Sequence, residues 1–332
     1  MRADEFDRWA ARELAEVEAA LEAWVPADAP AGLGEAMRYG VLDGGKRLRP
    51  LLVLAVCAAL DGQREAALRA SVAVELIHAY SLVHDDMPCM DDDVLRRGKA
   101  TVHVKFGEAQ AMLAGDAMQA LAFEVLTPDA DDSRGAADSA TGDAGMNGSA
   151  TDAAGMAGDA TGNPGAAGIE PALQARLCGL LARAAGHAGM AGGQAIDLAS
   201  TGQPLGETTL RDMHRRKTGA LLQASVLMGA ACGQPGPQAW RALTDYGAAI
   251  GLAFQVIDDI LDVTQPSSML GKTAGKDLNR NKPTYVSVLG LAEARRYADD
   301  LRAQAHAALE RSGLVAVAAL SMLADKVVER DS

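Results

Sequence analysis

Apolar and polar positions repeat with a helical period along most of this chain, and no run of alternating residues predicts a convincing β-strand. The stretch AALRASVAVELIHAYSLVH (66–84) is apolar nearly all round, which is typical of a helix inside a large bundle. We expect helices over residues 4–24, 30–41, 48–60, 64–85, 105–126, 171–200, 208–232, 237–263, 283–289, 291–311 and 314–329. The pattern therefore predicts an all-α fold, built as a single large helical bundle.

Residues 129–168 interrupt this pattern with a low-complexity stretch of Ala, Gly, Asp, Ser and Thr that contains the near-repeats ATGDAGM and ATDAAGM. Such a composition cannot bury enough apolar surface to offset the entropy of ordering, so we predict a disordered insertion between two helices. A loop that binds a partner is the alternative. Because motifs that belong together lie on both sides of the insertion, we expect residues 1–332 to form a single domain.

Composition and charge narrow the possible functions. Of the 332 residues, 49% are hydrophobic and only 4% are aromatic, a balance that favours helices over sheets. The net charge of −13 makes binding to nucleic acid or to an anionic membrane surface unfavourable. The cysteines form no CxxC pair, and no basic segment followed by an apolar run marks a signal peptide. We expect a cytoplasmic protein without stable membrane insertion, because the longest apolar run, LLVLAVCAAL (51–60), is about half of a membrane span.

One acidic motif reads FQVIDDILD (254–262). Asp258 and Asp262 are four residues apart and share a helix face, as do Gln255 and Asp259. An acidic, solvated helix face is one interpretation of this spacing. The residues before the motif are apolar, however, and acids in an apolar helix are costly unless they are paired or bind a metal. Carboxylate ligands of this kind suit Mg²⁺, which often bridges to substrate phosphates.

Another acidic motif, HDDMPCMDDD (84–93), has a different spacing. Asp85 and Asp91 would lie about 120° apart around an unbroken helix. Pro88 lies between them and disrupts helical hydrogen bonding, so we predict a break or bulge around Met87–Cys89 that lets the two carboxylates converge. We expect the two aspartates that end the motif to be solvated or paired with the arginines that follow.

Basic residues follow this motif and recur elsewhere. Arg96 and Arg97 come directly after the carboxylates, which suggests a metal and guanidinium groups acting on one polyanion such as a diphosphate. In GGKRLRP (44–50) the glycines allow a turn, so that Lys46, Arg47 and Arg49 can gather around an anion; a basic helix start on the surface is the alternative. The remaining basic motifs are RRKTG (215–219), with Lys217 and Thr218, and GKTAGKDLNRNKPT (271–284), with Lys272, Lys276 and Lys282.

In this order, from Gly44 to about Thr284, the motifs resemble those of the trans-isoprenyl diphosphate synthases, the polyprenyl synthetase family. The longer acidic motif DDMPCMD is most similar to that of bacterial farnesyl diphosphate synthases. The resemblance implies an isoprenoid synthase bundle with a central active-site cavity, and a homodimer. It implies a transferase of isoprenoid biosynthesis that condenses isopentenyl diphosphate with dimethylallyl and geranyl diphosphate, giving farnesyl diphosphate (C15), with about three Mg²⁺ ions at each site.

The resemblance also assigns roles to individual residues. It implies that metal is bound by Asp85, Asp91 and Asp258, with Asp86, Asp259 and Asp262 in support. It implies that the allylic diphosphate is touched by Arg96, Lys217, Lys272 and Lys282, and that isopentenyl diphosphate is bound by Lys46, Arg49, His78 and Arg97. It places Lys217, Thr218 and Gln255 at the reacting centre. Alone on an apolar helix His78 would be a core residue, but it lies on the same face as Asp85, about 10 Å away.

Product length depends on how deep the cavity is for the growing hydrocarbon tail. That tail should run from Asp85 along the helix face that precedes it. We expect the large Tyr80 to form the floor, and the small Ser81 to leave room for some growth. This arrangement resembles the farnesyl type.

Four other interpretations remain open. A geranylgeranyl (C20) diphosphate synthase would share every motif. A non-catalytic subunit of a prenyl synthase would be expected to lose an acidic motif or the basic loop, and both are present. A terpene cyclase would replace the later DDxxD motif, and a simple divalent-ion buffer would not need the basic residues.

Overall fold

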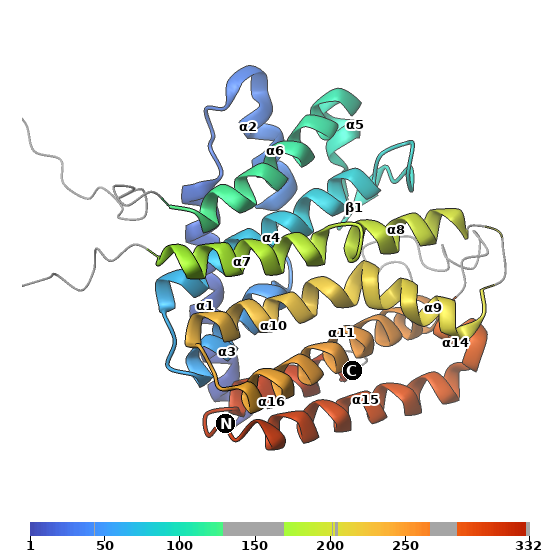
Figure 1. Cartoon of the computed structure of the whole chain (residues 1–332). Coiled ribbons are helices and arrows are strands. Elements are labelled where there is room, and N and C mark those ends of the chain that lie inside the picture. Colours follow the sequence, from blue (N-terminus) through green and yellow to red (C-terminus); the bar gives the residue numbers. More distant parts are fainter. Residues whose placement is uncertain (43, 129–168, 201, 203–204, 266–283, 330–332) are drawn as a thin grey trace, which may run out of the picture.

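The computed structural model describes residues 1–42, 44–128, 169–200, 202, 205–265 and 284–329, and within them it is an all-α bundle (Figure 1). The predicted insertion, residues 129–168, lies outside the described residues. The α-helices are α1 (Ala3–Trp24), α2 (Leu33–Val41), α3 (Leu48–Ala59), α4 (Arg64–Asp85), α5 (Val102–Phe106), α6 (Glu108–Leu126), α7 (Pro171–Ala185), α8 (Met190–Ala199), α9 (Glu207–His214), α10 (Ala220–Gly233), α11 (Pro237–Thr264), α14 (Tyr285–Leu289), α15 (Leu291–Ser312) and α16 (Ala318–Val328). A short 3₁₀ turn, η1 (Pro30–Gly32), precedes α2, and a π-helical turn, η2 (Arg215–Gly219), joins α9 to α10.

The all-α prediction is confirmed, but three expected helices are interrupted. The helix expected over 171–200 is split between α7 and α8, and the one expected over 105–126 is split at Gly107. The helix expected over 208–232 passes through the π turn. The interruptions are short, with four residues between α7 and α8 and one residue at Gly107, so the apolar pattern on both sides still indicates a helix.

A two-stranded hairpin, β1 (Leu95–Arg96) with β2 (Lys99–Ala100), was not expected from the sequence. Its strands are too short to show an alternating pattern. Arg97 and Gly98 at the turn both have positive φ, 52° and 78°, as in the tight turns that suit hairpins. The hairpin places Arg96 and Arg97 beside the end of α4.

The helix α4 lies at the centre and packs against α3, α6 and α10. Of the described helices it alone has the length and apolarity that a membrane-spanning segment needs, and 78% of its most apolar stretch is buried in the bundle. Burial of this kind is what a core helix shows, and it explains why α4 is apolar nearly all round.

The helices α3 and α10 are apolar on all sides for a related reason. They pack against each other between two hydrophobic clusters, and each contributes residues to both. Val53 and Met228 belong to the cluster around α4 and α6, whereas Leu52 and Leu222 belong to the cluster around α11 and α15.

The two ends of the expected insertion are held close together. The side-chain amide of Gln174 on α7 donates hydrogen bonds to the carbonyl oxygens of Pro128 and Ile169, at 3.2 and 2.8 Å. Pro128 and Ile169, which flank residues 129–168, are therefore held at neighbouring points of the bundle.

Arg47 holds the start of α3 against α1 and α4. It is 5% exposed, and its guanidinium donates to Glu18 and Glu75, each at 2.7 Å, and to the carbonyl of Val41. The expectation that Arg47 gathers around an anion with its neighbours was wrong, because its donors face these partners inside the bundle. The alternative of a basic helix start on the surface was also wrong for Arg47 and Arg49, which are both buried.

Removing the buried partner of Arg47 should destabilise the fold strongly. We expect Glu75→Leu to lower the free energy of unfolding by about 3–5 kcal/mol, because it leaves a buried guanidinium charge partly uncompensated. The matched control is Glu65→Leu, which removes an exposed partner of Arg69 and should cost less than about 1 kcal/mol. Urea denaturation of both variants measures the difference, and equal losses would contradict the role given to Glu75.

Candidate active site

The acidic motif at the end of α4 folds back on itself. The helix ends at Asp85, and the backbone N–H of Asp91 donates to the carbonyl of Asp85 at 2.8 Å. The N–H of Asp93 donates to the carbonyl of Asp86 at 3.0 Å. The predicted break is confirmed, although the helix ends at Asp85, just before the predicted Met87–Cys89. It brings Asp91 back to Asp85, as convergence of the two carboxylates requires.

Asp85 lies in a cluster of like charges. Burial raises its pKa to about 6, and the negative charges of Asp91 and Asp86 act in the same direction, while Lys217 and Arg96 oppose them. A carboxylate in this state gains from any further positive charge. The cluster is thus suited to a cation.

A cavity of about 540 Å³ lies between α4, α8, η2 and α11, and we refer to it as the acidic cavity. Asp85 from α4 and Asp258 from α11 both line it. Its apolar wall comes from residues of α4 and α8, among them Tyr80, Met190 and Leu198. One cavity therefore offers two carboxylates from separate helices together with room for a hydrocarbon group, and its volume is typical of ligand sites.

The other aspartates of the α11 motif are buried away from this cavity. Asp259 and Asp262 are 3% and 4% exposed. Asp259 accepts from the side-chain amide of Gln255 at 2.8 Å and from the backbone N–H of Tyr285 at 2.7 Å. Asp259 thus anchors the start of α14 to α11 and orients Gln255.

A hydrogen-bonded chain links Asp259 to the cavity wall. The hydroxyl of Thr218 donates to the amide oxygen of Gln255 at 2.9 Å, and Gln255 in turn donates to Asp259. Thr218 lies on the π turn, which is a type of turn often found at functional sites. A side chain at Gly193 would clash with the backbone of Lys217, at 2.2 Å from its nitrogen, so glycine there lets α8 approach the turn.

Lys217 points toward the acidic residues. Its ammonium group pairs with Asp197 of α8 at 2.5 Å, and its positive charge acts to lower the pKa of Asp85. Lys217 also lines the acidic cavity, as do Thr218 and Arg96. The π turn therefore brings a cation and a hydroxyl to the same cavity as the carboxylates.

A second cavity of about 220 Å³ adjoins the first, and we refer to it as the basic cavity. Lys46 lines it from the turn before α3. The residues that line both cavities are Arg49, His78, Arg97 and Phe254. The concentration of guanidinium and ammonium groups favours an anion in the basic cavity.

His78 lies among these cations, and its imidazole ring is neutral. Burial lowers its pKa well below the usual value, and the positive charges of Arg49, Arg97, Arg96 and Arg47 act in the same direction. A neutral imidazole can donate or accept one hydrogen bond without adding to the charge.

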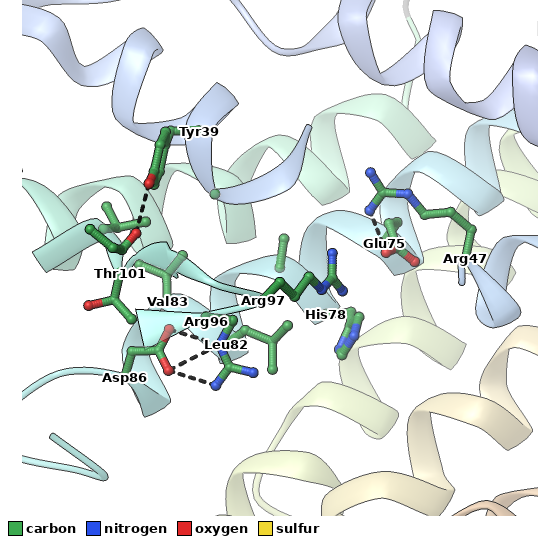
Figure 2. Close-up of a pocket in the computed structure, with 14 residues that line it drawn as sticks. Tyr39, Arg47, Glu75, His78, Leu82, Val83, Asp86, Arg96, Arg97 and Thr101 are labelled. Carbon is green, nitrogen blue, oxygen red and sulfur yellow. Dashed lines mark hydrogen bonds and ion pairs between the residues drawn. The ribbon is translucent and has the colours of Figure 1, made fainter. Parts of the chain in front are cut away.

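The two arginines of the hairpin have different partners (Figure 2). Arg96 forms a forked ion pair with Asp86, with nitrogen–oxygen distances of 2.6 to 3.0 Å. Arg97 donates to the carbonyl of Gly44, which ties the hairpin to the turn before α3. Figure 2 shows Arg97 and His78 between the Asp86–Arg96 pair on one side and the Glu75–Arg47 pair on the other.

The residues fit a divalent cation of the Mg²⁺ type. Among the described residues no three His, Cys, Asp or Glu side chains form a closed metal cluster. Mg²⁺ needs no such cage, because it binds through one or two carboxylates together with waters and phosphate oxygens. The clustered carboxylates near Asp85 and the carboxylate of Asp258 supply hard oxygen ligands on one cavity.

Sequence reasoning placed most of the cavity-lining residues but missed others. Asp197, which pairs with Lys217, and Phe254, which lines both cavities, were not predicted. An acid on the otherwise apolar helix MAGGQAIDLA was a signal for Asp197. Lys272 and Lys282 lie outside the described residues. Arg96 forms an ion pair with Asp86, and Asp92 is exposed to solvent.

Comparison with known proteins gives one consistent result. A family profile described as Polyprenyl synthetase matches residues 30–141 and 152–317. The chain is 43% identical over 300 residues to the farnesyl diphosphate synthase of Escherichia coli (strain K12), covering 90% of this chain and 89% of the relative. It is 41% identical over 304 residues to geranylgeranyl pyrophosphate synthase 11, chloroplastic, of Arabidopsis thaliana, covering 91% and 75%.

Solved structures agree with the fold. The apo structure of an FPP/GFPP synthase from Zymomonas mobilis has a TM-score of 0.77 and 37% identity, and the match covers 98% of this chain and 100% of that one. A geranyltransferase from Helicobacter pylori, complexed with magnesium and isoprenyl diphosphate, has a TM-score of 0.72 and 30% identity, with 97% and 95% covered.

Substitutions of the adjacent residues Asp258 and Asp259 on α11 should lower the free energy of unfolding by different amounts. We expect Asp259→Ala to lower the free energy of unfolding by about 1–3 kcal/mol, because it leaves the buried N–H of Tyr285 and the amide of Gln255 without their acceptor. The matched control is Asp258→Ala, at the cavity wall, which should lower the free energy of unfolding clearly less. Urea denaturation compares the two, and a larger loss for Asp258→Ala would overturn this assignment.

Proposed function

Because this chain belongs to the polyprenyl synthetase family and is a prenyltransferase, we propose that it adds isopentenyl diphosphate to dimethylallyl diphosphate and then to geranyl diphosphate, releasing farnesyl diphosphate. The observation that supports this reaction best is the pair of adjoining cavities. One has two carboxylates, a lysine, three arginines and an apolar wall, and the other has Lys46, Arg47, Arg49 and Arg97 with the single acid Glu75. Two substrates with diphosphate heads, of which one has a growing hydrocarbon tail, match that division.

The allylic diphosphate is proposed to bind in the acidic cavity. Lys217 and Arg96 contribute positive charge there, and Asp85, Asp91 and Asp258 would hold the metal. Mg²⁺, when bound there, supplies the positive charge that stabilises a leaving diphosphate. We propose about three ions for each site. Asp86, through its ion pair, keeps the guanidinium of Arg96 directed at this region.

Isopentenyl diphosphate is proposed to bind in the basic cavity. Lys46, Arg49 and Arg97 neutralise its diphosphate, and the neutral ring of His78 can donate one further hydrogen bond. Phe254 lines both cavities and thus lies where the two hydrocarbon parts would meet.

The bond changes follow from this placement. The allylic carbon–oxygen bond breaks, and the electron pair leaves with the diphosphate. The double bond of isopentenyl diphosphate then forms the new carbon–carbon bond, and a proton leaves the product cation. We propose that the released diphosphate accepts this proton. The oxygens of Thr218 and Gln255 face the developing positive charge, and Gln255 is kept in orientation by Asp259.

A homodimer is proposed as the working form. Apolar side chains on the outside of α5 and α6 support it, since Val104, Met112 and Leu113 are 49%, 41% and 54% exposed. Exposed apolar groups on neighbouring elements are typical of a surface that another subunit covers.

The C15 product is proposed because Tyr80 lies in the wall of the acidic cavity, on the turn of α4 that precedes Asp85. Relatives with FPP synthase and GGPP synthase names are about equally similar to this chain, so a C20 product is the second candidate. A non-catalytic role is the third.

The reaction itself is tested by mixing the pure protein with Mg²⁺, isopentenyl diphosphate and dimethylallyl diphosphate, and sizing the dephosphorylated products. We expect C15. Asp258→Asn should lower kcat about 10²-fold or more, since it removes charge that acts on the leaving group. The matched control is Asp300→Asn on α15, far from the motifs in sequence and exposed, which should leave the rate unchanged. A C20 product would favour the second candidate, and no product would favour a non-catalytic subunit.

Product length should depend on Tyr80 and Ser81. Tyr80→Ala removes bulk from the cavity wall, so we expect products longer than C15. Ser81→Phe adds bulk, so we expect shorter products such as C10. Chromatography of the dephosphorylated products measures both, and unchanged product profiles in both variants would contradict the proposed floor.

A further inference from the structure

The aromatic ring of Tyr80 is held by two neighbours. The ring of His84, one turn further along α4, meets it edge to face, with centroids 5.7 Å apart and an interplanar angle of 74°. The side-chain amide of Gln119 on α6 donates to the Tyr80 hydroxyl at 3.4 Å, which is a long and weak hydrogen bond. The orientation of Tyr80 therefore depends on contacts with its own helix and with α6.

His84 is itself wedged against α6. Its Nε2 donates to the carbonyl of Met112 at 3.0 Å. A side chain at Gly115 would begin 2.0 Å from the same nitrogen. The imidazole thus occupies space that exists only because residue 115 has no side chain. His84 also lines the acidic cavity, so any shift of its ring changes the space next to Tyr80.

We infer that His84 and Gln119 are positioning residues for product length, and that they act by fixing the ring of Tyr80 as the end of the hydrocarbon channel. This inference rests on the proposed function. A tyrosine on a helix can take more than one staggered χ1 rotamer, and a change of rotamer moves its ring. A longer hydrocarbon tail would be accommodated by turning the ring aside, and the contacts with His84 and Gln119 oppose that movement.

The contact between Gly115 and His84 predicts in which direction a substitution should change product length. A methyl group at this position pushes the imidazole of His84 away from α6, because the end of a side chain yields more easily than backbone. The displaced ring moves toward Tyr80 and the cavity and shortens the channel. Loss of the imidazole has the opposite effect, because Tyr80 is then free to turn aside.

The experiment uses the full-length protein with Mg²⁺, isopentenyl diphosphate and dimethylallyl diphosphate, and it measures the ratio of product lengths. We expect His84→Ala to raise the ratio of products longer than C15 to C15 about two- to tenfold, the range that corresponds to one edge-to-face aromatic contact. Gln119→Leu should shift the ratio in the same direction but less. Gly115→Ala should shift products toward C10.

Matched variants separate positioning from general damage. His84 is next to Asp85, the proposed metal ligand, so a substitution of His84 can lower the rate without changing product length. The quantity that tests the inference is therefore the ratio of product lengths. Tyr80→Phe keeps the ring but loses the hydroxyl, and it should reproduce the effect of Gln119→Leu. Adding His84→Ala to Gly115→Ala should abolish the shift toward C10, because the ring that the methyl group displaces is gone.

The outcomes distinguish this inference from the function on which it rests. A wild-type protein that makes no prenyl product would refute the proposed function. The positioning role alone is overturned if the wild type is active and Tyr80→Ala lengthens the products, while His84→Ala and Gln119→Leu keep the wild-type ratio.

Discussion

Burial of like charges at the end of α4 is the constraint on which the site depends. Asp85 is half-buried near Asp91 and the buried Asp86, and its pKa rises to about 6. Such a cluster is unfavourable unless positive charge lies close by. The structure supplies that charge from separate elements, with Arg96 on the hairpin and Lys217 on the π turn. The end of α4, the hairpin and the π turn therefore form one electrostatic unit, although more than 100 residues separate the first from the last.

The basic residues of the chain fall into two groups that composition does not distinguish. In GGKRLRP, Lys46, Arg47 and Arg49 all line the basic cavity, but the guanidinium of Arg47 is neutralised by Glu18 and Glu75. Positive φ angles at Gly44, Gly45 and Arg47 send successive side chains in different directions. The inward arginine fixes the start of α3, and through it the position of Arg49. A structural ion pair and the proposed anion site thus come from adjacent residues of one motif.

The apolar wall of the acidic cavity also depends on packing between helices. Tyr80 lies on α4, but the contacts that hold its ring involve α6 as well, through Met112, Gly115 and Gln119. The same helix presents apolar groups to solvent on its outer side, where the proposed homodimer would form. The proposed end of the hydrocarbon channel and the proposed subunit contact therefore both involve α6.

The sequence by itself determined the helical class, the approximate extent of most helices and the break near Pro88, because each depends on residues close together in the chain. It also determined the family, because each motif is a short local stretch and the order of the motifs can be read along the chain. Periodicity reports which face of a helix is apolar, and a proline acts on its own neighbours. Only the tertiary structure decided that Arg47 pairs with Glu75, that Asp86 pairs with Arg96, and that Asp259 accepts from Tyr285. Those partners lie between 10 and 28 positions apart. The direction of each side chain depends on helix packing and on a few positive φ angles, and neither leaves a local pattern in the sequence.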